Sequence, residues 1–174
     1  MSAFASAVTR WHDFYVVVGT AGATLVGLLF VSLSLNPHLI AAGERSGPRV
    51  LAAQSFANFV LVLIIALVFL IPDQSPLGLG LPLLGVAVYW LFLTGRRLQN
   101  ARRSSTSPWG RGGAARHVGV AAFFDVVLIA ISVTALLGIT SGLYWLVPVV
   151  LMLIYEAARN AWSLLLQFNP EVGE

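Results

Sequence analysis

Five long apolar stretches, separated by short polar segments, constrain this chain more than any other feature. Hydrophobic residues make up 58% of its 174 residues and charged residues 10%, whereas a soluble domain has about 45–50% and about 25%. The excess runs the whole length and leaves no segment for a soluble domain. Since a membrane-spanning helix needs about 20 apolar residues, we predict an all-α integral membrane helical bundle, with residues 1–174 forming a single transmembrane domain.

Proline, glycine and short polar runs set the expected ends of the first three spans. The first two are expected over about 14–35 and 50–71, because Asn36-Pro37 and Pro72-Asp73 follow them. The breaker residues between Asp73 and Gly80 predict a loop. A short third span is then expected over about 81–94.

The last apolar block, 118–155, is too long for one span. As a single helix it would measure about 57 Å at about 1.5 Å per residue, against a hydrocarbon core of about 30 Å. The turn signal Thr140-Ser141-Gly142 lies near its middle. Folding there predicts spans over about 118–139 and 143–166, five in all, with a four-span chain as the alternative.

Six of the ten basic residues lie between residues 96 and 117, and all ten are arginine. They are Arg96, Arg97, Arg102, Arg103, Arg111 and Arg116. Positive charge favours the cytoplasmic side, so we expect an Arg-rich cytoplasmic loop over 96–117 in a bacterial inner-membrane protein. Five spans then put the N-terminus outside and the C-terminus inside. Binding of lipid headgroups by Arg96, Arg97, Arg102 and Arg103 is a second role for this segment.

The first apolar stretch has the most regular pattern of small and weakly polar residues. Gly19, Ala23 and Gly27 recur every four residues, and Thr20, Thr24 and Ser34 accompany them. Small residues at this spacing let helices approach closely in lipid. The pattern therefore predicts either helix packing within the chain or a pore-lining face at the axis of a homo-oligomer.

One acidic residue, Asp125, falls well inside the fourth expected span. An ionisable group at that depth is costly and marks a candidate functional site. Folding the last hairpin at 141–142 places Asp125 at the depth of Arg159, and Glu156 lies one helical turn from Arg159. These three residues predict a structural charge cluster, with a proton or cation site as the alternative.

The remaining polar residues predict little chemistry. Gln54 and Asn58 share a face of the second span and are expected to join helices by hydrogen bonds. Cysteine is absent, and we find no catalytic motif among those with a known mechanism. The three histidines fall at different membrane boundaries, so we expect no metal site. Without a catalytic motif we expect no enzyme activity and no cofactor. The arginines are expected to act as a topology signal, so we expect no nucleic-acid binding.

The run Trp11-His12-Asp13-Phe14-Tyr15, with the apolar stretch Gly19 to Asn36, resembles the opening of small uncharacterised actinobacterial multi-pass membrane proteins. Some of these are labelled as modulators of a membrane-bound AAA protease, which implies an accessory role. The same residues also resemble the first helix of Orai calcium channels in Trp11, Asp13, Tyr15, Ala23, Leu25 and Gly27. In this chain the segment between the Trp11–Tyr15 run and the Ala23–Gly27 run is shorter than in Orai channels. Orai channels have an acidic residue in the ion-selectivity filter, and the matching position here is the apolar Leu35.

Two functions therefore remain open at this point. One is a homo-oligomeric pore or channel for a small ion or solute, built around the first helix. The other is a non-conducting accessory or regulatory subunit of a larger membrane complex, such as a membrane protease.

Overall fold

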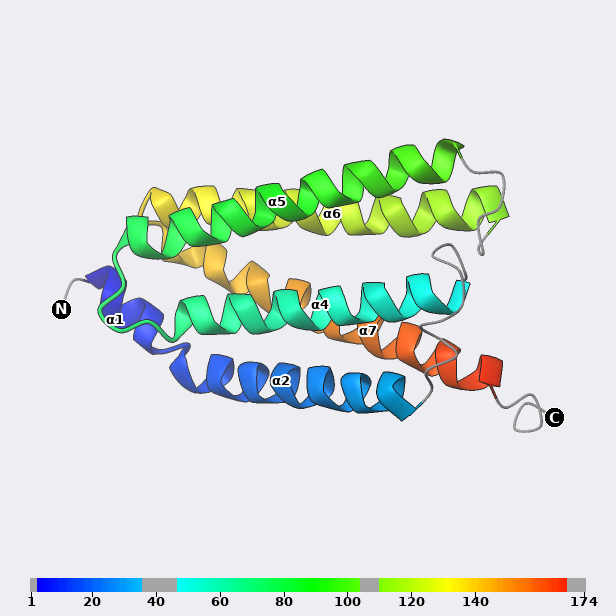
Figure 1. Ribbon diagram of the computed structural model, residues 1–174. Coiled ribbons are helices and arrows are strands. Elements are labelled where there is room, and N and C mark those ends of the chain that lie inside the picture. The colour runs from blue at the N-terminus through cyan, green and yellow to red at the C-terminus, as the bar shows by residue number, and fades with distance from the viewer. Residues whose placement is uncertain (1–2, 36–46, 104–109, 169–174) are drawn as a thin grey trace. The chain divides into compact units, whose positions relative to one another are not determined.

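The computed structural model describes residues 3–35, 47–103 and 110–168, and the regular elements in these ranges are helical. A short helix, α1, precedes five long ones, and a 3₁₀ helix, η1, leads into the last (Figure 1). The elements are α1 (Ala3–Thr9), α2 (His12–Leu35), α4 (Gly47–Phe69), α5 (Pro76–Arg103), α6 (Gly110–Leu136), η1 (Thr140–Trp145) and α7 (Leu146–Phe168). The predicted all-α class is confirmed.

Within the described ranges, five segments are long and apolar enough to cross a membrane. They are His12–Leu35, Ala52–Phe69, Pro76–Arg96, Gly119–Leu136 and Thr140–Trp162. Each overlaps one predicted span, and the long block after residue 118 does divide into two. The protein is therefore a multi-pass α-helical membrane protein, with five candidate spans rather than four.

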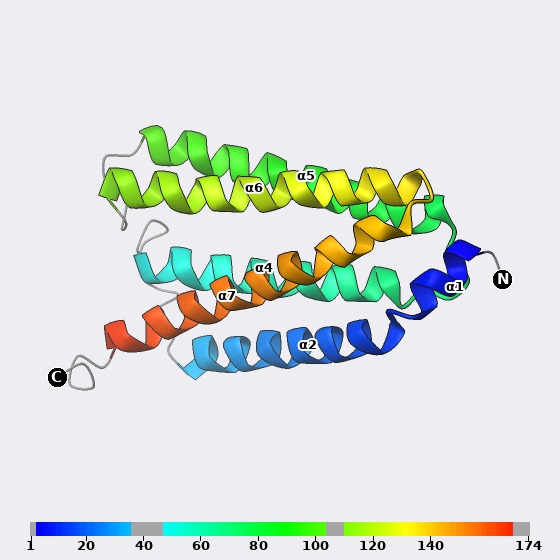
Figure 2. The same ribbon diagram turned by 180° about the vertical axis from the view of Figure 1, so that it is seen from behind.

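The helices belong to two compact units. The α5–α6 unit contains α1, α5, α6, η1 and the start of α7 as far as Val149. The α2–α4 unit contains α2 from Asp13, α4 and the rest of α7. In the first unit α5 and α6 run antiparallel and side by side, as Figures 1 and 2 show from opposite directions.

The loop predicted between Asp73 and Gly80 is wrong from Pro76 onward, because α5 begins there. Ser75 caps the helix: its Oγ accepts a hydrogen bond from the Gly78 N–H at 2.9 Å. Proline suits the first helical position, where an N–H would have no partner inside the helix. The third candidate span is consequently longer than predicted.

The described parts of the predicted Arg-rich loop are also helical. Helix α5 continues to Arg103 and α6 begins at Gly110, while residues 104–109 lie outside the described ranges. The helical residues therefore extend farther into the predicted loop, from both sides, than its polar composition suggested.

The reversal after α6 depends on Gly138, which has φ 77°. The Ile139 N–H donates to Thr134 O at 2.9 Å and the Gly138 N–H to Ala135 O at 3.0 Å. This pair of bonds is the Schellman arrangement, in which a left-handed glycine ends a helix. The predicted turn residues Thr140-Ser141-Gly142 form the start of η1, so the fold-back was located correctly but its terminator was missed.

Helix α1 was not predicted from the sequence. Its buried side chains are Phe4, Ala5, Ala7 and Val8, and it contacts η1. The ring of Trp11 meets the ring of Tyr144 edge-on, with centroids 4.8 Å apart. The N-terminal helix thus closes one end of its unit through apolar contacts.

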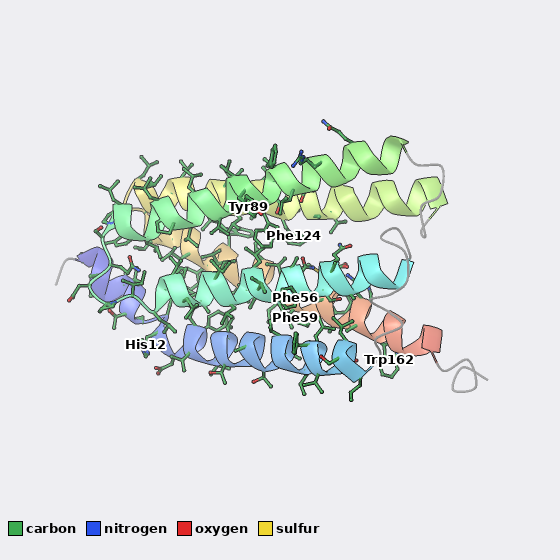
Figure 3. All side chains as sticks on the ribbon, in the orientation of Figure 1. His12, Phe56, Phe59, Tyr89, Phe124 and Trp162 are labelled. Carbon is green, nitrogen blue, oxygen red and sulfur yellow. The ribbon has the colours of Figure 1, made fainter. Side chains whose placement is uncertain are left out.

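Helices α2 and α4 pack closely through small and aromatic residues. The ring of Tyr15 stacks on Phe69 at 3.9 Å between centroids. A Cβ atom added at Gly19 would lie 3.2 Å from the Ala66 Cβ, so the two helices almost touch there. Farther along, Phe59, which Figure 3 labels on α4, packs with Leu29 of α2 and Ala157 of α7. These contacts determine which face of α2 remains uncovered.

Candidate functional site

Helix α2 has one buried face and one exposed face. Tyr15, Val18, Gly19, Gly22 and Leu29 are buried. Ala23 and Gly27, predicted to share the face of Gly19, are exposed, and a Cβ at Gly27 would meet nothing within 4 Å. The predicted close packing within the chain therefore applies to Gly19 and extends to Gly22 instead of Ala23. A spacing of four residues advances 400° around a helix, so each step drifts by about 40°.

The exposed face carries a stripe of residues spaced alternately three and four apart. We define the α2 stripe as Val17, Thr20, Thr24, Gly27, Val31 and Ser34, which are all exposed. The 3–4 alternation keeps side chains along one line of a helix and is the spacing of coiled-coil contacts. The predicted residues Thr20, Thr24, Gly27 and Ser34 are thus brought together, with Ala23 at their edge.

The hydroxyl groups of the α2 stripe donate to their own helix. Thr20 Oγ1 donates to Val16 O at 2.8 Å, and Thr24 Oγ1 donates to Thr20 O at 2.8 Å. Ser34 Oγ donates to Phe30 O at 2.9 Å. Because a hydroxyl oxygen also has two acceptor lone pairs, the stripe presents acceptor oxygens without unsatisfied donors. It is therefore weakly polar and compatible with an apolar neighbour.

The α5–α6 unit contains a buried polar contact at Asp125. Thr94 Oγ1 of α5 donates to Asp125 Oδ2 of α6 at 2.7 Å. Both residues are buried, with 4% and 6% of their surface exposed. A carboxylate in an apolar span needs such donors to offset its lost hydration. Thr94 was not identified from the sequence, since its position relative to Asp125 depends on how the two helices pair.

The other two members of the predicted charge cluster lie in the α2–α4 unit. Arg159 Nη2 and Glu156 Oε2 of α7 form an ion pair at 2.7 Å, one helical turn apart. The predicted proximity of Glu156 and Arg159 is thus present. The contact between Asp125 and Arg159 stays a prediction, as does the proton or cation site.

Helices α4 and α7 are joined by a hydrogen bond from a serine that was not identified from the sequence. Ser55 Oγ donates to Ala157 O at 3.1 Å, and both residues are fully buried. Asn58, one turn from Ser55, is also buried, whereas Gln54 is partly exposed. The small side chains of Ser55 and Ala157 permit the close approach that this bond needs, and the joining role of Gln54 and Asn58 stays a prediction.

The arginines of the predicted loop lie on the ends of two helices. Arg96 is exposed, and its guanidinium lies 5.1 Å from the centroid of the Phe92 ring. Arg97, Arg102 and Arg103 follow it on α5, and Arg111 and Arg116 lie on the first turns of α6. Arg45 and His38 lie outside the described residues.

No family model, curated protein or solved structure matches this chain. Within the described ranges, no group of three or more histidine and acidic side chains is placed to hold a metal ion. Functional inference therefore rests on the fold, on the α2 stripe and on the contacts of Asp125, Glu156 and Arg159.

Proposed function

We propose that the protein forms a homo-oligomer through the α2 stripe, with the first spans surrounding a narrow pore for a small ion or solute. The observation that carries this proposal is the exposure of the stripe. It is a continuous line of threonine, serine, glycine and valine residues on a candidate span that is only 22% buried within the protomer. Small residues at a helix surface favour close helix association in lipid.

The hydroxyl geometry indicates what such a pore would favour. The donors of Thr20, Thr24 and Ser34 are used within α2, so their oxygens remain as acceptors toward an axis. A ring of oxygen acceptors favours cations or hydrogen-bond-donating solutes over anions. Residues 14–35 contain no charged side chain, which predicts weak selectivity. The proposed setting is a bacterial inner membrane, with the N-terminus outside and the C-terminus in the cytoplasm.

A non-conducting accessory subunit is the second candidate. The hydrogen bonds that Thr20, Thr24 and Ser34 donate within α2 also favour this second candidate. A helix face with no unsatisfied donor suits contact with an apolar helix of a partner protein. The resemblance to labelled modulators of a membrane protease supports this alternative.

Single-cysteine cross-linking tests the assembly, because the native chain has no cysteine. Thr24→Cys and Val31→Cys on the stripe, each with one thiol per chain, should give disulfide-linked dimers in native membranes. Ala21→Cys and Phe30→Cys are matched controls, since both residues are exposed on α2 but lie on opposite flanks of the stripe, about 90° from its mean direction at about 100° per residue. Equal cross-linking at all four positions, or none, would overturn the stripe as an interface.

Flux measurements on protein-containing vesicles then separate the two candidates. A channel should pass small cations, and Thr24→Val should lower that flux while leaving the cross-linking pattern of Val31→Cys unchanged. Vesicles that stay tight while the stripe still cross-links would replace the channel with the accessory role.

A further inference from the structure

Helix α1 lies at the end of the α5–α6 unit where α5 begins and α6 ends, as Figures 1 and 2 show. It contacts η1, and the turn after it closes with a hydrogen bond from the Trp11 N–H to Val8 O at 2.9 Å. This turn places the Trp11 ring edge-on against the Tyr144 ring of η1, with centroids 4.8 Å apart. Trp145 follows Tyr144 and ends η1. We define the aromatic ledge as Trp11, Tyr144 and Trp145.

Two members of the aromatic ledge are largely exposed. Tyr144 and Trp145 have 69% and 67% of their surface exposed, whereas the adjacent Leu143 of η1 is fully buried. Each exposed ring presents a large apolar area together with one polar group, a phenol hydroxyl or an indole N–H, that forms hydrogen bonds. The surroundings that suit both parts of such a side chain are apolar on one side and wet on the other.

The surface of this unit changes from polar to apolar near the aromatic ledge. Arg10, next to Trp11, and Asp73, just before α5, are both exposed. Exposed apolar side chains begin within a few residues on the two helices at this end, with Leu77 on α5 and Leu137 on α6. The two helix ends lie together, because the position of a Cβ added at Gly80 falls against Leu136. The ledge therefore lies where an aqueous phase would meet hydrocarbon.

We propose that the aromatic ledge is an interfacial anchor, which binds the glycerol and carbonyl layer of the phospholipid bilayer and sets the depth of the α5–α6 unit. Tryptophan and tyrosine favour this layer, since the ring contacts acyl chains while the N–H or O–H donates to lipid carbonyl oxygens and water. Arg10 and Asp73 then lie on the aqueous side of the anchor. The proposal does not depend on pore formation or on the α2 stripe.

Depth-dependent quenching of tryptophan fluorescence in phosphatidylcholine bilayers tests the anchor. The chain has five tryptophans, so a full-length variant that keeps Trp145 and has phenylalanine at the other tryptophan positions reports on the ledge. Lipids brominated near the headgroup end of the acyl chain should quench Trp145 roughly twofold more strongly than lipids brominated near the methyl end. A variant that keeps only Trp90 is the matched control. Trp90 lies about 21 Å along α5 from Pro76 at about 1.5 Å per residue, so it should show the opposite preference.

If the single-tryptophan variants fail to fold, the difference between the quenching of the wild type and that of Trp145→Phe isolates the Trp145 signal. A shallow Trp145 together with a deep Trp90 would support the anchor. Equal or stronger quenching of Trp145 by the deep bromines would place the ledge in the hydrocarbon core. Without quenching by either lipid, emission at the wavelength of tryptophan in water would place the ledge in solution, and blue-shifted emission would place a protein surface over it. Each of these last three results would overturn the proposal.

Discussion

The polar contact between α5 and α6 depends on the buried hydroxyl group of Thr94. Its Oγ1 donates to Asp125 Oδ2 at 2.7 Å in a part of the span from which water is excluded. Removing the donor leaves the carboxylate with one fewer hydrogen bond. Losing a hydrogen-bond donor to a buried acceptor lowers the free energy of unfolding by more than losing a solvent-exposed hydrogen bond does.

We expect Thr94→Val to lower the free energy of unfolding by about 1–2 kcal/mol, measured by detergent-induced unfolding. Thr9→Val is the matched control, because that hydroxyl donates to Ala5 O of its own helix, and it should change stability by less than about 0.5 kcal/mol. Equal losses in the two variants would show that the contact with Asp125 contributes nothing specific.

Some residues of these polar contacts could be predicted from the sequence, and others could not. The cost of a buried charge singled out Asp125, and helical spacing brought Glu156 next to Arg159. Thr94 and Ser55 could not be predicted, because a hydrogen bond between helices depends on their rotation and relative depth. Many threonines and serines occur in the spans, and one sequence does not tell which of them meets a partner.

At the scale of the helix pair, Gly80 determines how closely α5 approaches α6. A Cβ added there would lie 2.6 Å from Leu136 Cγ and 2.9 Å from the backbone nitrogen of Leu136. The neighbouring helix would therefore have to move. The sequence pattern identified Gly80 only as a loop residue, since a glycine that permits close packing looks the same as one that permits a turn.

Gly80→Ala should therefore lower the stability of the protein by about 1–3 kcal/mol. Gly85→Ala makes the same change in the same helix, where a Cβ would meet nothing within 4 Å. That control should be neutral or stabilising by up to about 1 kcal/mol, since alanine is the better helix former. Thermal unfolding of the two purified variants makes the comparison, and a Gly80→Ala protein as stable as Gly85→Ala would refute the close approach.

Helix α2 offers a second comparison on one element. At Gly22 a side chain would point toward Val62, Leu63 and Phe59, whereas at Gly27 it would enter open space. Gly22→Leu should lower the melting temperature of the protomer. Gly27→Leu should leave it unchanged but weaken the oligomer, as sedimentation in mild detergent would show. Loss of protomer stability in Gly27→Leu with no change of oligomer size would place that residue against the protomer's own helices.

At the scale of the whole molecule, hydropathy was sufficient to predict the class and the five spans. The apolar stretches are long, and the bilayer thickness imposes a length that proline and glycine then delimit. The boundaries were less predictable. Ser75 and Pro76 start α5 inside a segment read as a loop, and Gly138 rather than the residues after it ends α6. In both places one local hydrogen-bonding arrangement prevailed over composition.

Five membrane-crossing helices would place the two ends of the chain on opposite sides of the membrane. Fusing a pair of reporters, one active only in the cytoplasm and one active only outside it, to each terminus measures this directly. We predict an external N-terminus and a cytoplasmic C-terminus, because the six arginines at the adjoining ends of α5 and α6 favour the inner side. Both termini on the same side of the membrane would contradict a topology of five membrane crossings.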